Sequence, residues 1–347
     1  MITSSKALRS GFSVIIGSLI CVIALNAGAA ARKTVDDLFP QNPDPLIGDY
    51  LGRWNDEIDI DPEVAAQVIA LGGDKYRIKI VSKLDMRAPV QLDTEVRAKK
   101  GVIKFEDGRF YGEIKNGVFT GGKGKTDVFK MEHIVRLSPT LELKAPAEAI
   151  QIYDGDFDNF EDSTGWESLE NGVFMVTPES DYLTSKEVYR DVRIHLEFRL
   201  AHMPRARGQS RSNSGLFMGD EYEVQILDSY GLEGLYNECG ALYKVSAPHV
   251  NASAPPVQWQ TFDVMYRAAR HNADGELTEN PTMSVLHNGV IIHNETEMKW
   301  ITGWKENERM EPHPTEPGHV KLQGHGNYVQ FRNFWLVDLG EGDESTF

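Results

Sequence analysis

Eight polar residues in the second half of the chain have the types and spacing of a ligand-binding face. They occupy alternate positions in short apolar stretches, or lie directly beside such stretches. They are Glu197, Arg199, Asn213, Glu223, Gln225, Gln323, His325 and Arg332. An ordinary solvated strand face would carry mainly Thr, Ser, Lys and Glu, whereas amides and carboxylates together can donate to and accept from hydroxyl groups. The mixture therefore predicts a polyhydroxylated ligand. Cross-strand ion pairs on a plain surface are the alternative.

Strands with a single apolar face must position these side chains. In residues 190–200 the even-numbered positions from Val192 onward are apolar and the odd-numbered positions are polar, and residues 222–226 and 319–325 repeat this period of two. In residues 328–337 the pattern predicts that Trp335 and Val337 share the core face with Val329 and Phe331. Asn288-Gly289 is a hairpin turn signal. Many short strands without a convincing helix predict an all-β, antiparallel sandwich over residues 147–340.

A smaller β-rich domain is expected before the sandwich, over residues 32–146. In residues 101–120, Asp107-Gly108 and Asn116-Gly117 are turn dipeptides between short alternating strands. Residues 61–71 fit either a helix or the first half of a hairpin that turns at Gly72-Gly73. Two prolines and a loss of periodicity over residues 138–146 indicate a linker. Residues 341–347 form an acidic tail.

The N-terminus and the net charge limit the location and the partners. Lys6 and Arg9 precede an apolar run over residues 12–25, and small residues follow it, so residues 1–31 are expected to be a secretory signal peptide. We therefore expect an exported bacterial protein, periplasmic or extracellular, without stable membrane insertion. A formal net charge of −16 argues against nucleic acid as a partner. Once Cys21 is removed, Cys239 has no partner for an intramolecular disulfide.

Four segments of the second domain carry a family resemblance. They are NSGLFMGDEYEVQILDS (213–229), GALYKVSAPHVNASAPPVQW (240–259), HNGVII (287–292) and VKLQGHGNYVQFRNFWL (320–336). In this order they resemble the signature blocks of the 3-keto-disaccharide hydrolase family, and the likeness covers nearly all of residues 152–339. The resemblance implies a concanavalin-like jelly roll whose concave sheet holds the ligand. The upstream segment resembles an accessory β domain found in some family members.

The resemblance also implies a substrate, a saccharide or glycoside already oxidised at C3. A 3-keto group acidifies the C2 hydrogen, so a base could remove it and the C1 substituent could leave by elimination. Glu223 and His325 are the expected catalytic pair, either as base and acid or as ligands of a divalent metal ion acting as a Lewis acid. No other cofactor is expected. The residues expected to bind substrate are Asn213, Gln225, Gln323 and Arg332, followed by Glu197, Lys321 and Tyr243. A non-catalytic carbohydrate-binding protein is the alternative, because the fold alone does not decide function.

Overall fold

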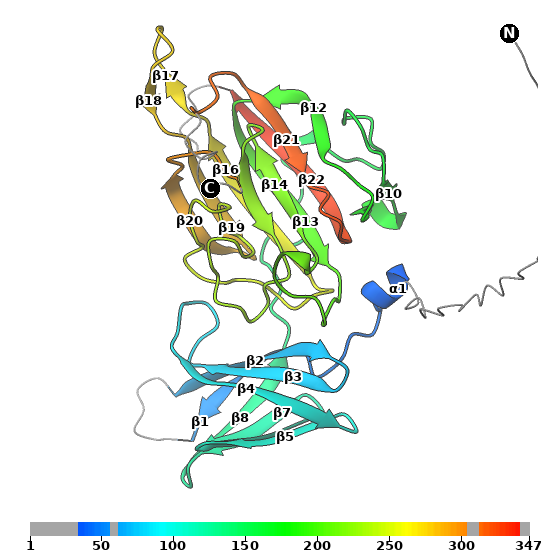
Figure 1. Ribbon diagram of the computed structural model, residues 1–347, viewed down its shortest axis with the longest axis vertical. Coiled ribbons are helices and arrows are strands. Elements are labelled where there is room, and N and C mark those ends of the chain that lie inside the picture. The colour runs from blue at the N-terminus through cyan, green and yellow to red at the C-terminus, as the bar shows by residue number, and fades with distance from the viewer. Residues whose placement is uncertain (1–33, 56–61, 304–311, 341–347) are drawn as a thin grey trace, which may run out of the picture.

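A computed structural model describes residues 34–55, 62–303 and 312–340 of the 347-residue chain. The described part is almost entirely β, as the sequence predicts, and its strands form a barrel followed by a sandwich (Figure 1). A single helical turn, α1 (Val35–Leu38), precedes the barrel. No helix among the described residues is long and apolar enough to cross a membrane. The expected signal peptide lies outside the described residues.

Eight antiparallel strands close into the barrel because the first strand pairs with the last. They are β1 (Gly48–Trp54), β2 (Glu63–Gly72), β3 (Lys75–Val81), β4 (Val90–Lys99), β5 (Val102–Asp107), β6 (Phe110–Lys115), β7 (Val118–Lys123) and β8 (Asp127–Ile134). Of the two alternatives for residues 61–71, the hairpin is confirmed, and both glycines at its turn have positive φ. Fully buried side chains such as Tyr50, Ile78 and Phe119 form the barrel core.

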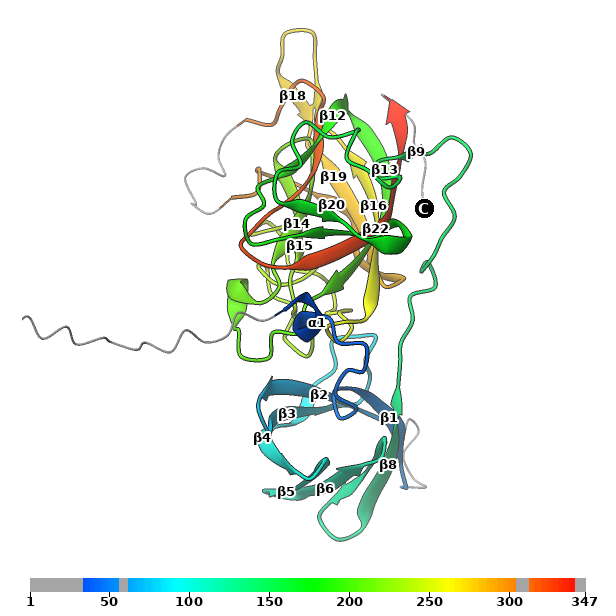
Figure 2. The ribbon, with the colours of Figure 1, turned by 90° about the vertical axis from the view of Figure 1, so that its right-hand side faces the viewer.

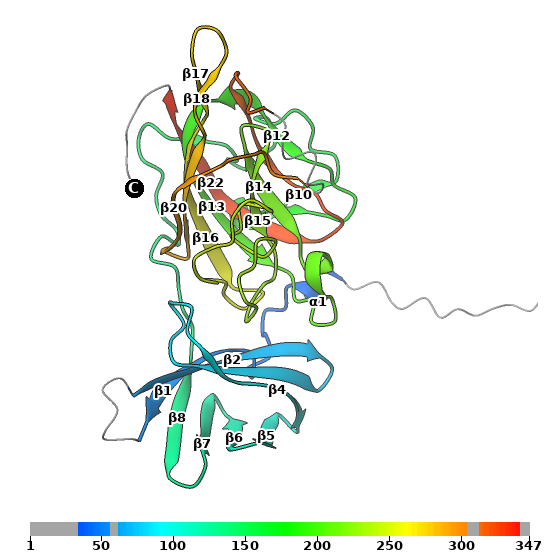
Figure 3. The same ribbon diagram turned by 60° about the vertical axis from the view of Figure 1, so that its left-hand side comes forward.

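The sandwich consists of a large and a small antiparallel sheet packed face to face (Figure 2). The large sheet has the order β10 (Trp166–Ser168), β11 (Phe174–Val176), β22 (Val329–Gly340), β13 (Asp191–Leu200), β16 (Trp259–Arg267), β19 (Thr282–His287) and β20 (Val290–Glu297), and β9 (Ile150–Gln151) also pairs with β22. The small sheet has the order β12 (Leu183–Tyr189), β21 (Gly318–Leu322), β14 (Ser214–Met218) and β15 (Tyr222–Ile226). A hairpin of β17 (Arg270–His271) and β18 (Leu277–Glu279) projects from one end of the sandwich (Figure 3).

Alternate residues of both sheets meet in one core. Leu196 and Phe198 of the large sheet and Leu216, Val224 and Leu322 of the small sheet are fully buried in the same cluster. With strict alternation along a strand, their neighbours point away from this core on the outer face of each sheet. The outer faces of the two sheets therefore lie on opposite sides of the sandwich.

The last strand departs from strict alternation. The prediction that Trp335 and Val337 occupy the core face is wrong, because Phe334 and Leu336 occupy the core instead. Asn333 has a φ of +46°, and the register between β22 and β13 shifts at this point. This bulge turns the rest of the strand over, so that every later side chain changes face.

Candidate functional site

Most of the predicted ligand-binding residues lie on the outer face of the small sheet. We call this surface the small-sheet face. Its members come from β15 and β21, from the positions just before β14 and just after β21, and from the segment next to β15: Asn213, Glu223, Gln225, Tyr243, Lys321, Gln323 and His325. Phe217, which pairs with both Glu223 and Lys321, lies among them. The structure therefore brings together residues that are more than a hundred positions apart in the sequence.

Glu223 occupies a nearly dry position on this face. Its side chain projects between Phe217 on β14 and the segment containing Tyr243, whose backbone N–H donates to the Glu223 carbonyl at 3.0 Å. Only 5% of Glu223 is exposed. The carboxylate leans over Gly215, where a Cβ atom would collide with Glu223 Oε1. A residue without a side chain at position 215 is therefore what allows the carboxylate to lie here.

Burial alone shifts the titration of this carboxyl group. It raises the pKa of Glu223 to about 8. Within the described residues, no hydrogen bond or ion pair to the side chain opposes the shift. A carboxyl group with such a pKa can take up and release protons near neutral pH, which is the property of a general base or acid.

A network of side-chain amides orients two further hydrogen-bond acceptors on the small-sheet face, the carbonyl oxygens of the Asn213 and Gln225 side chains. Gln209, on the short 3-10 helix η2 (Gly208–Ser210), accepts hydrogen bonds through Oε1 from Asn213 Nδ2 at 3.1 Å and from Gln225 Nε2 at 2.9 Å. Its own Nε2 donates to the Asn237 carbonyl at 2.7 Å. This arrangement leaves Asn213 Oδ1 and Gln225 Oε1 buried, with no hydrogen-bond donor in the described part of the chain. Buried acceptors without partners are costly, so they point to a ligand that donates hydrogen bonds or carries positive charge.

His325 stands at one end of the small-sheet face. It follows β21, and its Nδ1 lies 3.4 Å from Asn213 Nδ2. Asn213 thus links the imidazole to the amide network. This position next to Asn213 is compatible with the predicted catalytic role.

The tyrosine ring of Tyr182 and the cation of Lys321 complete the other end of this face. Gln323 Nε2 donates to the Tyr182 hydroxyl at 3.1 Å, and the Tyr182 ring packs edge-on to Phe217. Burial raises the Tyr182 pKa, and the charge of Glu223 adds to this shift, so the two groups are close enough to interact. The Lys321 amine forms an ion pair with Asp220 at 2.7 Å. Lys321 is therefore on the predicted face, but its charge is already engaged.

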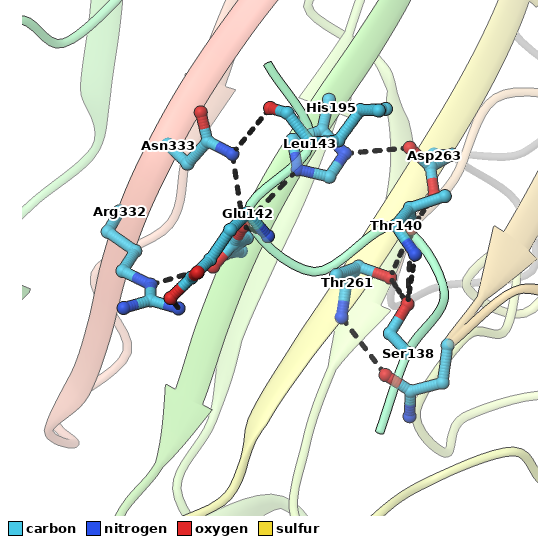
Figure 4. Close-up of polar contacts among 11 residues, drawn as sticks. Ser138, Thr140, Glu142, Leu143, His195, Thr261, Asp263, Arg332 and Asn333 are labelled. Atoms are coloured by element: carbon cyan, nitrogen blue, oxygen red, sulfur yellow. Dashed lines mark hydrogen bonds and ion pairs between the residues drawn. The ribbon is translucent and has the colours of Figure 1, made fainter. Parts of the chain in front are cut away.

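Glu197 and Arg332 are on the opposite side of the sandwich, so the prediction that they share a ligand face with Glu223 is wrong. The fully buried Glu197 carboxylate accepts hydrogen bonds from Arg332 Nε at 2.7 Å and from Asn333 Nδ2 at 3.0 Å (Figure 4). Burial by itself would raise the Glu197 pKa, but these and other hydrogen bonds outweigh it and lower the pKa to about 2. A carboxylate held in this way is part of a structural ion-pair network.

The linker after β8 covers this second cluster. Its Thr140 hydroxyl donates to Asp263 Oδ2 at 2.6 Å, and its Glu142 backbone N–H donates to Glu197 (Figure 4). Asp263 also contacts His195 Nδ1 at 2.7 Å. The cross-strand ion pairs considered as an alternative therefore describe the outer face of the large sheet, whereas the ligand hypothesis fits the small-sheet face.

Three residues of the small-sheet face escaped sequence reasoning. Gln209 and Tyr182 lie outside regular strand patterns, and only the fold brings them to Gln225 and Gln323. Gly215 carried a usable signal, because a glycine at an outward position within a strand marks a close approach of another group. The connection over residues 299–317 lies partly outside the described residues, but its Thr302 hydroxyl accepts from the Glu223 backbone N–H at 3.3 Å.

The described residues give limited support for a metal ion. They contain no group of three or more His, Cys, Asp or Glu side chains that could hold one. Glu223, Asn213 and Gln225 all lie on the small-sheet face, and carboxylate and amide oxygens are the ligand types that a hard divalent cation prefers. Such an ion would need oxygens from the substrate or solvent to complete its coordination.

The family of this chain follows from comparison with known proteins. Residues 148–337, more than half of the chain, match the family model described as 3-keto-alpha-glucoside-1,2-lyase-like domain, and the chain belongs to this family. The resemblance predicted from the four sequence segments is confirmed. The family and the fold define a carbohydrate-active hydrolase or lyase.

Solved structures similar to this chain come from Parabacteroides distasonis ATCC 8503. One, described as a "putative glycosyl hydrolase", is 32% identical, and the match covers 56% of this chain and 85% of that chain with a TM-score of 0.49. A second with the same description is 19% identical, with coverages of 55% and 94% and a TM-score of 0.41. No curated protein matches the chain significantly.

Proposed function

We propose that this protein cleaves glycosides or disaccharides oxidised at C3, by removing the C2 proton and eliminating the C1 substituent. The observation that carries the proposal is the Glu223 carboxyl group, which is dry, unpaired within the described residues and has a pKa of about 8. An ordinary glycosidase needs two carboxylates on either side of the scissile bond. The small-sheet face offers one unpaired carboxylate with amides and an imidazole, which suits proton abstraction next to a carbonyl group.

The proposed reaction needs one base and one proton donor. The Glu223 carboxylate takes the proton from C2, and the electron pair of the C2–H bond passes into an enediolate that includes the C3 oxygen. Its collapse forms the C1–C2 double bond and breaks the bond from C1 to the leaving group, which takes a proton from His325. Addition of water across the double bond then gives the 3-keto sugar and completes a net hydrolysis. The steps balance without an oxidant or reductant.

The amides of the small-sheet face suit substrate binding. Asn213 Oδ1 and Gln225 Oε1 are buried acceptors that sugar hydroxyls would satisfy. Gln323, held by Tyr182, can bind a further hydroxyl. In the variant of this proposal with a divalent cation, Glu223 would hold the ion, and the ion would polarise the C3 carbonyl.

The test compares a 3-keto-glucoside with its unoxidised parent, both carrying a chromogenic leaving group. Purified mature protein is incubated with each, with chelator and with added divalent ions, and release of the leaving group is followed. We expect release from the keto substrate only. Absence of release from the keto substrate under every condition contradicts the proposal, and tight binding without turnover would instead indicate a carbohydrate-binding protein.

Two variants test the assigned residues. Glu223→Gln removes the base, and His325→Ala removes the proton donor, so we expect kcat to fall by roughly 10²-fold or more in each. Glu187→Gln is the matched control, because Glu187 is an exposed carboxylate on the same sheet. Full activity in folded Glu223→Gln protein would remove Glu223 from the mechanism.

A further inference from the structure

The long connection between β15 and β16 touches the barrel on one side and the small-sheet face on the other. We call residues 227–258 the bridging segment. It contains no named strand, and its loops reach from the sandwich towards β2 and β3 of the barrel (Figure 1, Figure 3). Connections of this length inside a compact fold usually have a functional reason.

On the barrel side, Arg87 holds the bridging segment at two separate places. Arg87 belongs to the connection between β3 and β4. Its Nη2 donates to the carbonyls of Gly234 at 2.6 Å and Pro248 at 3.0 Å, and its Nε donates to the His249 carbonyl at 3.1 Å. One guanidinium therefore joins two separate parts of the segment, at Gly234 and at Pro248–His249, to the barrel. Loss of this group would leave three backbone carbonyls without these donors.

Other contacts make the same junction specific. The nearly buried Lys79 amine on β3 donates to Glu233 Oε1 at 2.8 Å, and the Tyr230 hydroxyl donates to Asp49 Oδ1 on β1 at 2.9 Å. Gly231 packs so closely on the barrel that a Cβ atom there would lie 2.6 Å from Ile69. The junction therefore consists of directional polar contacts and a close backbone approach. These contacts hold the bridging segment in a defined position on the barrel.

On the site side, the bridging segment runs beside β15. Gly240 N–H donates to the Gln225 carbonyl at 2.8 Å, Gln225 N–H donates to the Ala241 carbonyl at 2.9 Å, and Tyr243 N–H donates to the Glu223 carbonyl. The Asn237 carbonyl accepts from Gln209, the residue that orients the Asn213 and Gln225 amides. The segment therefore forms one wall of the small-sheet face.

A short chain of hydrogen bonds connects the two sides. Gly234, whose carbonyl binds Arg87, donates its N–H to Glu238 Oε2 at 2.6 Å. Ala241 N–H donates to the Glu238 carbonyl at 3.0 Å, and Ala241 in turn binds Gln225. One residue, Glu238, stands between Gly234 and Ala241, so a displacement of the Gly234 end of the segment reaches Gln225 through two hydrogen bonds of Glu238.

We propose that Arg87, acting through the bridging segment, is a positioning residue for the small-sheet face, so that the barrel is needed to place the Gln225 side of the site. This inference deepens the proposed function and rests on it for its kinetic readout. Preorganisation of groups around a reacting centre is worth large factors in rate, and a misplacement of about 1 Å can cost roughly 10²-fold. Arg87 itself is not proposed to touch the substrate.

The test uses the full chain with Arg87→Ala, Arg87→Lys and the matched control Arg97→Ala. Arg97 forms an exposed ion pair with Asp74 within the barrel. In Arg87→Ala we expect kcat on the 3-keto-glucoside to fall about tenfold, with KM changed less than about threefold, because bound substrate meets a misplaced site. Arg87→Lys should recover part of kcat, since an amine reaches only some of the three carbonyls. Arg97→Ala should match wild type.

Hydrogen exchange measured by mass spectrometry gives a readout that needs no activity. Peptides covering 234–243 should exchange faster in Arg87→Ala than in Arg97→Ala. If kcat and exchange are the same in both variants, the proposal is wrong. If Arg87→Ala does not fold, Arg87→Lys replaces it as the milder variant, and kcat and exchange equal to those of Arg97→Ala overturn the proposal. If wild type cleaves no 3-keto-glucoside, the proposed function fails, and the exchange data alone decide whether Arg87 controls the segment.

Discussion

At the scale of single residues, the small-sheet face is defined by one carboxyl group and the space left for it. Glu223 lies over Gly215, beside Phe217, with only 5% of its surface exposed. Removing an ionisable group from water destabilises its charged form, and here no hydrogen bond or ion pair from the described residues compensates. Burial of Glu223 thus lowers the stability of the folded protein when the carboxyl group is ionised, whereas a carboxylate with hydrogen-bond partners would not have this effect.

Glu223→Gln should stabilise the protein in alkaline solution while lowering its activity. The pKa of Glu223 is about 8 in the folded state against 4.5 for a solvated glutamate, so folding favours the protonated carboxyl group. The stability contributed by the protonated Glu223 carboxyl group is fully present below pH 4.5 and is lost as pH rises through 8. A glutamine stays neutral at every pH, so this loss does not occur. We therefore expect the free energy of unfolding of Glu223→Gln to exceed that of wild type by about 3 kcal/mol at pH 9. Thermal unfolding across pH 5–9, with chelator present, measures it. A variant that is less stable than wild type at pH 9 would contradict the burial of a charged Glu223.

Gly215→Ala should displace the carboxylate without unfolding the sandwich. The added methyl group would occupy the place of Glu223 Oε1 on the outer face of the sheet, away from the core. We expect kcat to fall at least about tenfold with little loss of thermal stability, because the base moves away from C2. Kinetics on the 3-keto-glucoside and a melting curve check this. Wild-type kcat in Gly215→Ala would show that the position of Glu223 does not matter.

At the scale of elements, the linker after β8 is fixed to the large sheet by polar contacts. Ser138 contacts Thr261 at 2.6 Å, Thr140 donates to Asp263, and Asn333 Nδ2 donates to the Leu143 carbonyl at 2.9 Å. The linker therefore lies over two buried charged residues of the large sheet, Glu197 of β13 and Asp263 of β16. This explains why a mixture of polar residue types that resembles a binding face is structural on this sheet.

The buried His195 should make this part of the sandwich sensitive to pH. Burial alone would lower the His195 pKa, but the hydrogen bond to Asp263 at 2.7 Å and the nearby Glu197 carboxylate, 3.6 Å from Nε2, outweigh it and raise the pKa above 6.5. The stability from protonated His195 is thus present below pH 6.5 and is lost as pH rises through the folded pKa. In a Glu223→Gln background, His195→Asn should be less stable by roughly 1–3 kcal/mol at pH 6, and the difference should shrink at pH 9. Denaturant unfolding at both pH values measures this. A difference that grows with pH would contradict it.

At the scale of the whole molecule, a barrel and a sandwich share one continuous polar junction. Asp49 of the barrel accepts from Tyr230 and forms an ion pair with Arg136, and Arg136 also donates to the Ser253 carbonyl at 3.2 Å. Charged groups buried in this way require accurate placement. The two domains are therefore expected to move together around the site.

We propose that the protein is exported and that residues 1–31 are removed, which would place the site where extracellular glycosides are met. The support is the sequence pattern of Lys6 and Arg9 before an apolar run. Expression in a bacterial host should give mature protein outside the cytoplasm, with a new N-terminus close to residue 32. N-terminal sequencing of the periplasmic fraction checks this. Full-length protein confined to the cytoplasm would contradict it.

The sequence by itself determined the strands, the all-β class and the family. Alternation in 190–200 and 222–226, together with the Asn116-Gly117 and Asn288-Gly289 turns, depends only on local geometry and could be read directly. The sequence also indicated that Glu223, Gln225 and His325 belong to one site, because all three lie in segments that resemble the family's signature blocks.

Only the tertiary structure decided which polar residues share a face. Glu197 and Glu223 both alternate with apolar neighbours, but they belong to different sheets, and strand order is set by long-range pairing that one sequence does not show. Gln209 and Arg87 act on the site through contacts with residues distant in sequence, and the bulge at Asn333 reversed the faces of β22. Local periodicity indicates which way a side chain points only as far as the next bulge, whereas packing of the sheets, the linker and the barrel decides what it contacts there.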